Sequence, residues 1–269
     1  MNQKIAGRMK NWAEIAHNEM PGLVEKIRYR IKPIDLRACY MSLASNHRIF
    51  GMYDYLIEGK IRSLKQHFYV ASKLCLASIR EDEYQQFETG GDIFDALLSD
   101  CSEVINAMAH LETPTLIRER DNPLWSRFHV HMLQLAIRGE DAALREKIEK
   151  IAKHGKKPER QASTSGQDFY SLLLQRDQAG LESLIQNKSA RIKSADPLIE
   201  DWMSYLGTLQ TKLCWLKGIP VQIDSPLVPM ELMPIQPLAH YDDVYDFLQP
   251  GWVPPSQGIV GRVSRWLKR

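Results

Sequence analysis

The sequence LIEDWMSYLGTLQTKLCWLKGIP, residues 198–220, decides how this chain folds. Its large apolar residues recur every three or four positions and so share one face of a helix: Leu198, Trp202, Leu206, Leu209, Leu213 and Leu216. Gly218 readily adopts the left-handed conformation in which helices end, and Pro220 prevents the helix from continuing. The stretch predicts a core helix that holds the segment after it.

The same helical spacing dominates the first half of the chain. Apolar residues between positions 5 and 16 form one stripe, Pro21 interrupts it, and a second short helix is expected between residues 23 and 31. Sustained alternation of polar and apolar residues is absent, and only residues 220–223 are compatible with a short strand. The predicted fold class is all-α, built from antiparallel helical hairpins.

Two stretches in the middle of the chain repeat with a shift of 37 residues. The shift aligns Leu135 with Leu172, Ile137 with Leu174, Glu140 with Asp177, Ala142 with Ala179, Leu144 with Leu181, and Ile148 with Ile185. Each copy predicts a helix, a tight turn and a second helix, with Glu140 or Asp177 capping the second helix. The insert at residues 155–166 is basic and rich in Ser and Thr, so an exposed loop is expected. Two copies predict a partly repeat-like fold, not a regular solenoid.

Length and composition limit the organisation of the chain. With 269 residues and 44% hydrophobic content it can bury a sizeable core. We expect an N-terminal helical region over residues 1–120 and a C-terminal hairpin region over residues 121–269, packed as one compact unit. The cysteines at 39, 75, 101 and 214 form no disulfide or zinc pattern. An apolar leader and a membrane-length apolar run are both absent, which predicts a cytoplasmic location.

Charge is segregated along the chain, although the net charge is only +2. Residues 218–261, here named the proline-rich arm, contain no Lys or Arg but hold five acids and eight of the fourteen prolines. Because proline fixes φ and removes a backbone donor, the arm cannot be one long helix. Its negative charge favours a surface that meets a basic partner, and the alternative is an arm packed on its own core. Residues 144–160 carry seven bases against three acids, which we interpret as a solvated face and, alternatively, as a nucleic-acid contact.

No residue pattern predicts catalytic residues, a metal site or a cofactor. His129 and His131 are two positions apart, so on a helix they diverge and cannot chelate one ion together. Residues 90–92 lack the lysine of a phosphate-binding loop, and residues 163–166 lack the strand that precedes a nucleophile elbow. We therefore expect a protein that is not an enzyme.

Aromatic residues accompany the acids of the arm. Tyrosine and tryptophan beside carboxylates commonly anchor protein interfaces. The predicted partner-binding residues are Asp224, Glu231, Tyr241, Asp242, Asp243, Tyr245 and Asp246. Tyr241 and Tyr245 are expected to be at least partly exposed, and Trp202 and Trp215 to lie inside. In the competing interpretation, the acids neutralise basic segments of this same chain, either the stretch at residues 153–160 or the tail at Arg262, Arg265, Lys268 and Arg269, which lies outside the residues that the structure describes.

Residues 213–232, LCWLKGIPVQIDSPLVPMEL, resemble the C-terminal block of the immunity protein 49 family of bacterial polymorphic-toxin systems. In that block a helix ends in glycine, and an acid–x–proline step leads through a second proline into another helix. The corresponding positions here are Gly218, Asp224, Pro226 and Pro229. The turn acids at 140 and 177 resemble the middle of the same family, so the resemblance covers roughly residues 125–233.

The resemblance implies an all-helical, non-enzymatic protein that neutralises a protein toxin by binding it. With a cytoplasmic location, the toxin would act on a cytoplasmic target such as nucleic acid or a nucleotide cofactor. The acids of the arm favour a toxin with a basic surface, and neither a membrane nor a nucleic-acid partner is expected. Two other hypotheses stay open: a helical-repeat adaptor that binds a peptide or a secretion component, and a small helical hydrolase.

Overall fold

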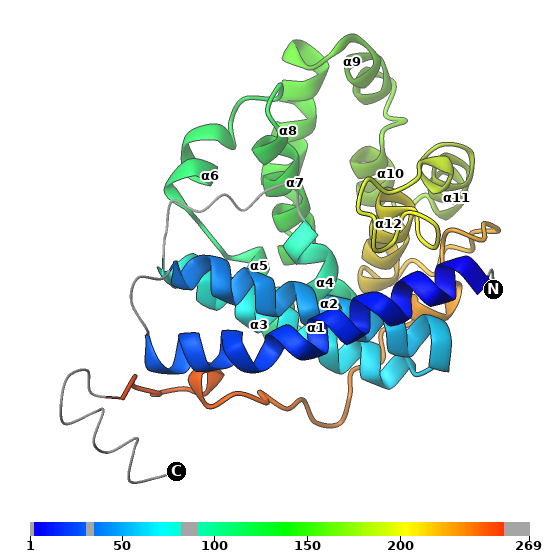
Figure 1. The fold of residues 1–269 in the computed structure, drawn as a ribbon. Coiled ribbons are helices and arrows are strands. Elements are labelled where there is room, and N and C mark those ends of the chain that lie inside the picture. The colour runs from blue at the N-terminus through cyan, green and yellow to red at the C-terminus, as the bar shows by residue number, and fades with distance from the viewer. Residues whose placement is uncertain (1–2, 31–34, 82–90, 256–269) are drawn as a thin grey trace, which may run out of the picture. The chain divides into compact units, whose positions relative to one another are not determined.

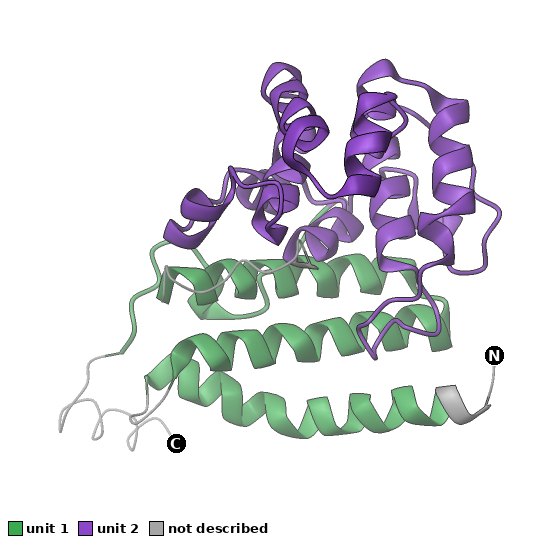
Figure 2. Cartoon of the chain, turned by 90° about the horizontal axis from the view of Figure 1, so that it is seen from above, with its two compact units in different colours: residues 1–82, 240–269 green, residues 83–239 purple. Residues whose placement is uncertain are grey.

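The structure is a computed structural model and describes residues 3–30, 35–81 and 91–255. Within these ranges every regular element is an α-helix or a short 3-10 helix (Figure 1), which confirms the all-α prediction. Residues 220–223 are extended chain without strand pairing. The chain divides into two compact units: unit 1 is residues 1–82 with 240–269, and unit 2 is residues 83–239 (Figure 2).

This division cuts the proline-rich arm. Residues 218–239, the proximal arm, belong to unit 2, and residues 240–255, the distal arm, belong to unit 1. The boundary expected at residue 120 lies inside unit 2. The distal arm packs on the first three helices through long-range contacts, which no local sequence pattern predicts.

Three long helices form the body of unit 1, whose elements are α1 (Gln3–Tyr29), α2 (Leu36–Glu58), α3 (Ile61–Glu81) and the 3-10 turn η3 (Asp246–Leu248). α1 packs on α2, and α2 packs on α3. α1 runs through Pro21, so the predicted interruption there is wrong. Met9, Ala16 and Ile27 are buried, whereas Pro21 is exposed. Packing of the buried face keeps the helix continuous despite the hydrogen bond that proline removes.

α2 and α3 approach each other closely at Gly51. A Cβ added there would lie 3.1 Å from Cβ of His67 and 3.2 Å from the ring of Phe68. The close approach brings side chains of both helices into one surface. The distal arm contacts this surface through η3 and α3.

Unit 2 consists of shorter helices: α4 (Gly91–Ser99), α5 (Ser102–Ala109), α6 (Pro114–Glu119), α7 (Ser126–Arg138), α8 (Asp141–His154), α9 (Lys157–Thr164), α10 (Phe169–Gln175), α11 (Gln178–Asn187), η1 (Ser189–Arg191), α12 (Tyr205–Leu216) and η2 (Met230–Leu232). α4 packs on α5 and α12, and α8 packs on α7, α9 and α10. Phe94, Phe128 and Leu181 are among the fully buried side chains.

α7–α8 and α10–α11 are two antiparallel hairpins with the same turn, as the internal repeat predicts. In each turn the amide of the acid, Glu140 or Asp177, donates to the carbonyl five positions earlier at 3.0 Å. Asp177 caps α11 by accepting from the amide of Gly180 at 2.9 Å. Glu140 makes no such cap, contrary to the prediction, because its carboxylate binds Nε of Arg138 at 2.5 Å instead.

The predicted exposed loop at residues 155–166 is wrong, because residues 157–164 form α9. Pro158 lies in the first turn, where its fixed φ suits a helix start. The carboxylate of Glu159 accepts from the amide of Lys156 at 3.4 Å and caps the same end. Ser163 is buried, and α9 packs on α8. Tertiary packing thus makes a helix of a polar segment that lacks an apolar stripe.

α12 begins later than the apolar spacing predicts. Leu198 is buried, but it lies in a series of turns that precede the helix. The hydroxyl of Ser204 caps the helix by accepting from the amide of Gly207 at 3.1 Å. The amide of Ser204 donates to the carbonyl of Leu227 at 2.7 Å, which diverts the chain from a helical path. The end is as predicted, with Gly218 left-handed at φ +69°.

Candidate functional site

The distal arm is bound to α3 by polar contacts of its backbone and its acids. The side-chain amide of Gln66 bonds both the amide and the carbonyl of Asp242, at 3.1 and 2.7 Å. Asp243 accepts from the hydroxyl of Tyr69 at 2.7 Å and pairs with Lys73 at 3.2 Å. These contacts fix the register of the arm on the helix.

A second acid of the distal arm is paired with α1. Asp246 lies 3.0 Å from Arg28, and its carboxylate also accepts from the amide of Phe247 at 3.0 Å. The side chain of Asp242, in contrast, is 77% exposed beside His240. Two of the three acids at 242–246 therefore neutralise basic residues of this chain, and one faces solvent.

A chain of hydrogen bonds runs beneath the distal arm. The hydroxyl of Tyr245 lies 2.8 Å from Nε2 of His47, and Nδ1 of His47 lies 2.9 Å from Nδ1 of His67. Burial lowers the pKa of His47 to about 3, and the charge of protonated His67 acts in the same direction. Burial also lowers the pKa of His67, against the opposing effect of Asp54. Both rings are therefore neutral near pH 7, and one Nδ1 donates to the other.

The hydrogen-bonded cluster does not have the arrangement of a nucleophilic site. Ser63 donates to Asp54, whereas a serine nucleophile needs a histidine as its hydrogen-bond partner. Nε2 of His67 lies 3.7 Å from Asp54 on the other side. The cluster connects α2, α3 and the distal arm, and its geometry suits holding the arm in place.

Aromatic packing buries one tyrosine that the sequence places on the surface. Tyr245 stacks on Phe247 with ring centroids 4.9 Å apart, and Phe247 meets the edge of Tyr40 at 5.9 Å. Tyr245 is only 8% exposed, so the expectation that it is partly exposed is wrong. Tyr241 is half-buried against Tyr69, with ring centroids 4.9 Å apart.

In unit 2 a buried lysine holds the proximal arm. Nζ of Lys212 donates to the carbonyls of Leu232 and Met233 at 2.6 and 3.3 Å. It also lies 2.6 Å from a carboxylate oxygen of Asp100, and both side chains are at most 1% exposed. The other carboxylate oxygen of Asp100 accepts from the amide of Gln236 at 3.2 Å. One buried ion pair thus connects α12, the end of α4 and the arm.

The structure does not bring the seven predicted partner-binding residues together on one unit. Asp224 and Glu231 belong to unit 2 and are exposed, and the other five belong to unit 1. The backbone of Asp224 is held by the side chain of Gln186, which bonds its carbonyl at 2.6 Å and its amide at 2.8 Å. The carboxylate of Asp224 is thereby presented from a fixed backbone.

The two tryptophans expected inside, Trp202 and Trp215, are each half-buried. Nε1 of Trp215 donates to the carbonyl of Val221 at 3.0 Å. The indole therefore covers the first turn of the proximal arm and does not reach the centre of the core.

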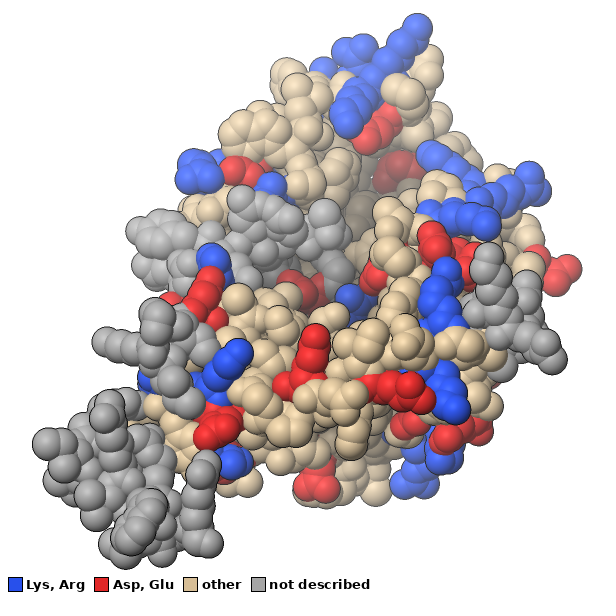
Figure 3. Space-filling model, viewed as in Figure 1, with Lys and Arg blue, Asp and Glu red and all other residues tan. Residues whose placement is uncertain are grey.

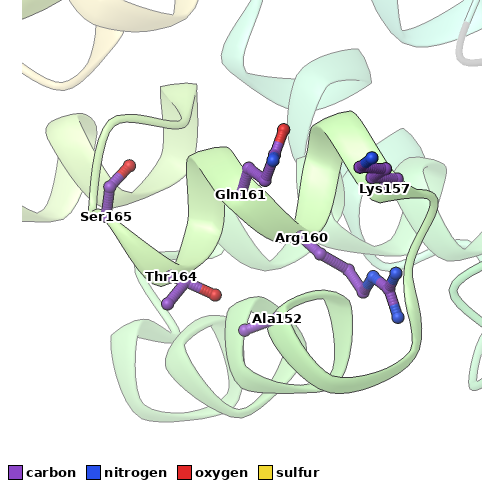
Figure 4. Close-up of a pocket in the computed structure, with 6 residues that line it drawn as sticks. All are labelled: Ala152, Lys157, Arg160, Gln161, Thr164 and Ser165. Carbon is purple, nitrogen blue, oxygen red and sulfur yellow. The ribbon is translucent and has the colours of Figure 1, made fainter.

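The sequence interpretation missed a basic depression between α8 and α9 (Figure 4). It is lined by Ala152, Lys157, Arg160, Gln161, Thr164 and Ser165. The excess of basic residues at 144–160 indicates a positively charged surface in this region. The depression forms because residues 157–164 are a helix, and the sequence predicted a loop there instead.

The described part of the chain contains no group of three or more His, Cys, Asp or Glu side chains that could hold a metal ion. His129 and His131 both lie on α7. Burial is the largest cause that lowers the pKa of each, to about 4 for His131. Among the helices of residues 3–30, 35–81 and 91–255, none has the length and apolar character needed to cross a membrane.

Residues 60–232 match the family described as Immunity protein 49. The matched region is 173 of the 269 residues, well over half of the chain. The chain belongs to the immunity protein 49 family. In this family member the match begins just before α3, includes the described helices of unit 2 and ends at η2. It therefore extends further toward the N-terminus than the resemblance at 125–233, and it excludes the distal arm. No curated protein and no solved structure matches the chain.

Proposed function

We propose that this member of the immunity protein 49 family binds a cognate bacterial toxin that acts in the cytoplasm. It neutralises the toxin by occluding the toxin's functional surface, without catalysis. The family match over residues 60–232 carries the proposal. A second support is the anchoring of the proximal arm, because the buried Asp100–Lys212 pair is hydrogen-bonded to its backbone. A pre-organised surface binds more tightly because less conformational entropy is lost on association.

The proposed contact residues of the arm are the exposed acids Asp224, Glu231 and Asp242 and the half-buried Tyr241. Their carboxylates complement a toxin with a basic surface and would accelerate its association. Asp243, Tyr245 and Asp246 act indirectly, because their side chains hold the distal arm on unit 1.

The proposal is tested by protection. The full-length chain is purified from its native cell, the protein that accompanies it is identified, and that protein is produced in a separate host. Host cells are expected to survive only when the full-length chain is co-expressed. Killing that continues in the presence of the chain contradicts the proposed function.

Stoichiometry separates occlusion from catalysis. An occluding protein must be present at about one equivalent, because each copy covers one toxin molecule. Titration of the toxin's activity is therefore expected to reach zero near a one-to-one ratio. Complete loss at a small fraction of an equivalent would show turnover and contradict the non-catalytic mechanism.

A second candidate function is a helical-repeat adaptor, and the matching turns of α7–α8 and α10–α11 favour it. Such hairpins stack into surfaces that bind extended peptides. An adaptor would bind a short peptide of its partner as tightly as the whole partner. An immunity protein is expected to need the folded toxin.

A further inference from the structure

The end of α6 and the turn that leads to α7 form an exposed apolar elbow in unit 2. Within this elbow, residues 117–125, the side chains of Ile117, Leu124 and Trp125 are 47%, 54% and 44% exposed. Asn122 shapes the turn: its side chain accepts from the amide of Leu124 at 3.0 Å, and its carbonyl from the amide of Trp125 at 3.1 Å. A tryptophan held by a defined turn is a typical interface anchor, because it buries a large area at low entropic cost.

The charged side chains around the elbow are paired with one another. Glu119 pairs with Arg118 at 2.8 Å and with Arg127 at 3.5 Å. Arg120 pairs with Glu112. An apolar centre surrounded by mutually neutralised charges has the composition of a protein interface, whose core is apolar and whose rim is polar.

The α8–α9 hairpin beside the elbow has cations in excess. Asp121 of the elbow bonds Nζ of Lys150 at 3.1 Å, which connects the elbow to the last turns of α8. Beyond this contact Lys156, Lys157 and Arg160 are exposed. None of the three forms an ion pair with another described residue. Figure 3 shows Lys and Arg side chains gathered over this end of unit 2, and Lys157 and Arg160 line the depression of Figure 4.

We propose that the elbow and the α8–α9 hairpin form one docking surface for an acidic patch of a protein partner. The partner is the cognate toxin, so the inference rests on the proposed function. Trp125 supplies the apolar anchor, and Lys157 and Arg160 pair with carboxylates of the toxin. This surface is positively charged and prefers an acidic patch of the toxin, whereas the acidic arm prefers a basic one. Reversing the charge of each surface in separate variants therefore distinguishes their contributions to binding.

Acidic side chains on the same hairpin favour a protein over a nucleic acid. Glu146 and Glu149 are exposed on α8. A nucleic-acid backbone carries negative charge at regular intervals and would be repelled by them. A protein surface can place its own lysines against these acids while its carboxylates meet Lys157 and Arg160. The exposed aliphatic side chains of Ile117 and Leu124 also suit an interface core.

The test uses the full-length chain and the toxin identified by the protection experiment, with the dissociation constant measured by calorimetry. The test variants are Trp125→Ala and the double charge reversal Lys157→Glu/Arg160→Glu. The matched controls are Ile192→Ala, at an apolar residue with a similar exposed fraction of 47%, and Lys188→Glu/Lys193→Glu, which makes the same change in charge at exposed residues following α11. Thermal unfolding of each free variant checks that it is folded.

Each test variant is expected to weaken toxin binding at least about tenfold, about 1.4 kcal/mol, while each control stays within about twofold of the original chain. Added salt should weaken binding of the original chain more than binding of Lys157→Glu/Arg160→Glu, because salt screens the paired charges. Equal affinities of test and control variants overturn this surface but leave the proposed function standing. Absence of toxin binding by the original chain overturns both.

Binding to a short DNA duplex tests the other class of partner, a nucleic acid. The original chain is expected to bind the duplex no more tightly than Lys157→Glu/Arg160→Glu does. Duplex binding that the double reversal abolishes, together with unchanged toxin binding, would assign the surface to nucleic acid and overturn the proposal.

Discussion

Lys212 and Asp100 form a buried pair in which neither charge reaches water. Transfer of two ions from water is costly, and the cost is recovered only where geometry and further hydrogen bonds are good. Further hydrogen bonds are present here, since Lys212 has carbonyl partners and Asp100 accepts from the amide of Gln236. Asp100 also has a left-handed backbone, φ +59°, a conformation that Asp and Asn tolerate better than most residues. The pair therefore specifies how the arm crosses α12.

We predict that Lys212→Met lowers the free energy of unfolding by about 3–5 kcal/mol, because it removes the cation that lies 2.6 Å from the buried Asp100 carboxylate. Adding Asp100→Asn in the double variant is expected to recover much of the loss, since it removes the buried negative charge and suits the left-handed backbone. Chemical denaturation measures both. The control Lys10→Met, at an exposed lysine of α1, should change stability by less than about 0.5 kcal/mol. Similar losses in the single and double variants would contradict the explanation.

The buried histidines predict a loss of stability in acid. An unfolded imidazole binds its proton near pH 6.5, whereas His47, desolvated and close to His67, binds it only near pH 3. Between these values the unfolded state holds more protons, so stability falls as pH is lowered from 6.5 toward 3. The slope for one histidine approaches about 1.4 kcal/mol per pH unit, and His131, with a pKa lowered to about 4, adds to it.

The measurement is urea unfolding at a series of pH values. His47→Gln is expected to reduce the slope, and His17→Gln, at an exposed position of α1, to leave it unchanged. A slope that survives His47→Gln in full would show that other groups control the acid sensitivity.

At the scale of elements, the distal arm is held to its helices by a small number of charge pairs. Asp243→Lys/Asp246→Lys is predicted to destabilise the free protein by about 1–2 kcal/mol, because two favourable pairs, with Lys73 and Arg28, become repulsive. Asp242→Lys should change stability little, since its side chain is largely exposed. Thermal and chemical unfolding of the free chain measure the stability of each variant. Equal stability of the two variants would mean that the charge pairs do not stabilise the distal arm in solution.

How far the sequence predicts an element depends on where its determinants lie. The end of α12 at Gly218 and the matching turns of the hairpins are encoded within a few residues, and those predictions are confirmed. The course of α1 through Pro21, the helical state of α9 and the late start of α12 depend on packing against other elements. Spacing along the chain does not reveal such packing.

The candidate site shows the same division. The acids of the arm are visible in the sequence as a charge asymmetry, and its tyrosines as aromatic residues close to these acids. Whether Asp243 faces a toxin or Lys73 depends on a contact between positions about 170 residues apart. The depression at Lys157 and Arg160 requires α8 and α9 to be folded together. The exposure of Trp125 is likewise not predicted by its residue type, and the structure places it just after the turn at Asn122.

At the scale of the whole molecule, unit 2 is inserted into unit 1. Along the sequence, residues 83–239 come after the helices of unit 1 and before the distal arm that completes that unit. Insertions of this kind are tolerated when the inserted unit has its own core. Unit 2 meets this condition, with Phe94, Phe128 and Leu181 fully buried.

We predict that a fragment of residues 83–239 unfolds cooperatively, whereas a fragment of residues 1–82 melts well below unit 1 of the intact chain. A synthetic peptide of residues 240–255 is expected to raise the melting temperature of the 1–82 fragment, because it restores the contacts of Tyr245 and Asp243. The same peptide with Tyr245→Ala serves as control and should have little effect. A fragment of residues 1–82 that is fully stable alone would contradict this account of unit 1.

The insertion also sets an order of events on the ribosome. The helices of unit 1 leave the exit tunnel first, and the segment that completes them leaves only after all of unit 2 has been translated. At about 5–20 residues per second, the wait is roughly 8–30 s. During that interval the nascent chain exposes the surface of His47 and Tyr69, which in the finished protein is bonded to Tyr245 and Asp243. Unit 1 is therefore complete only after residues 240–255 have been translated.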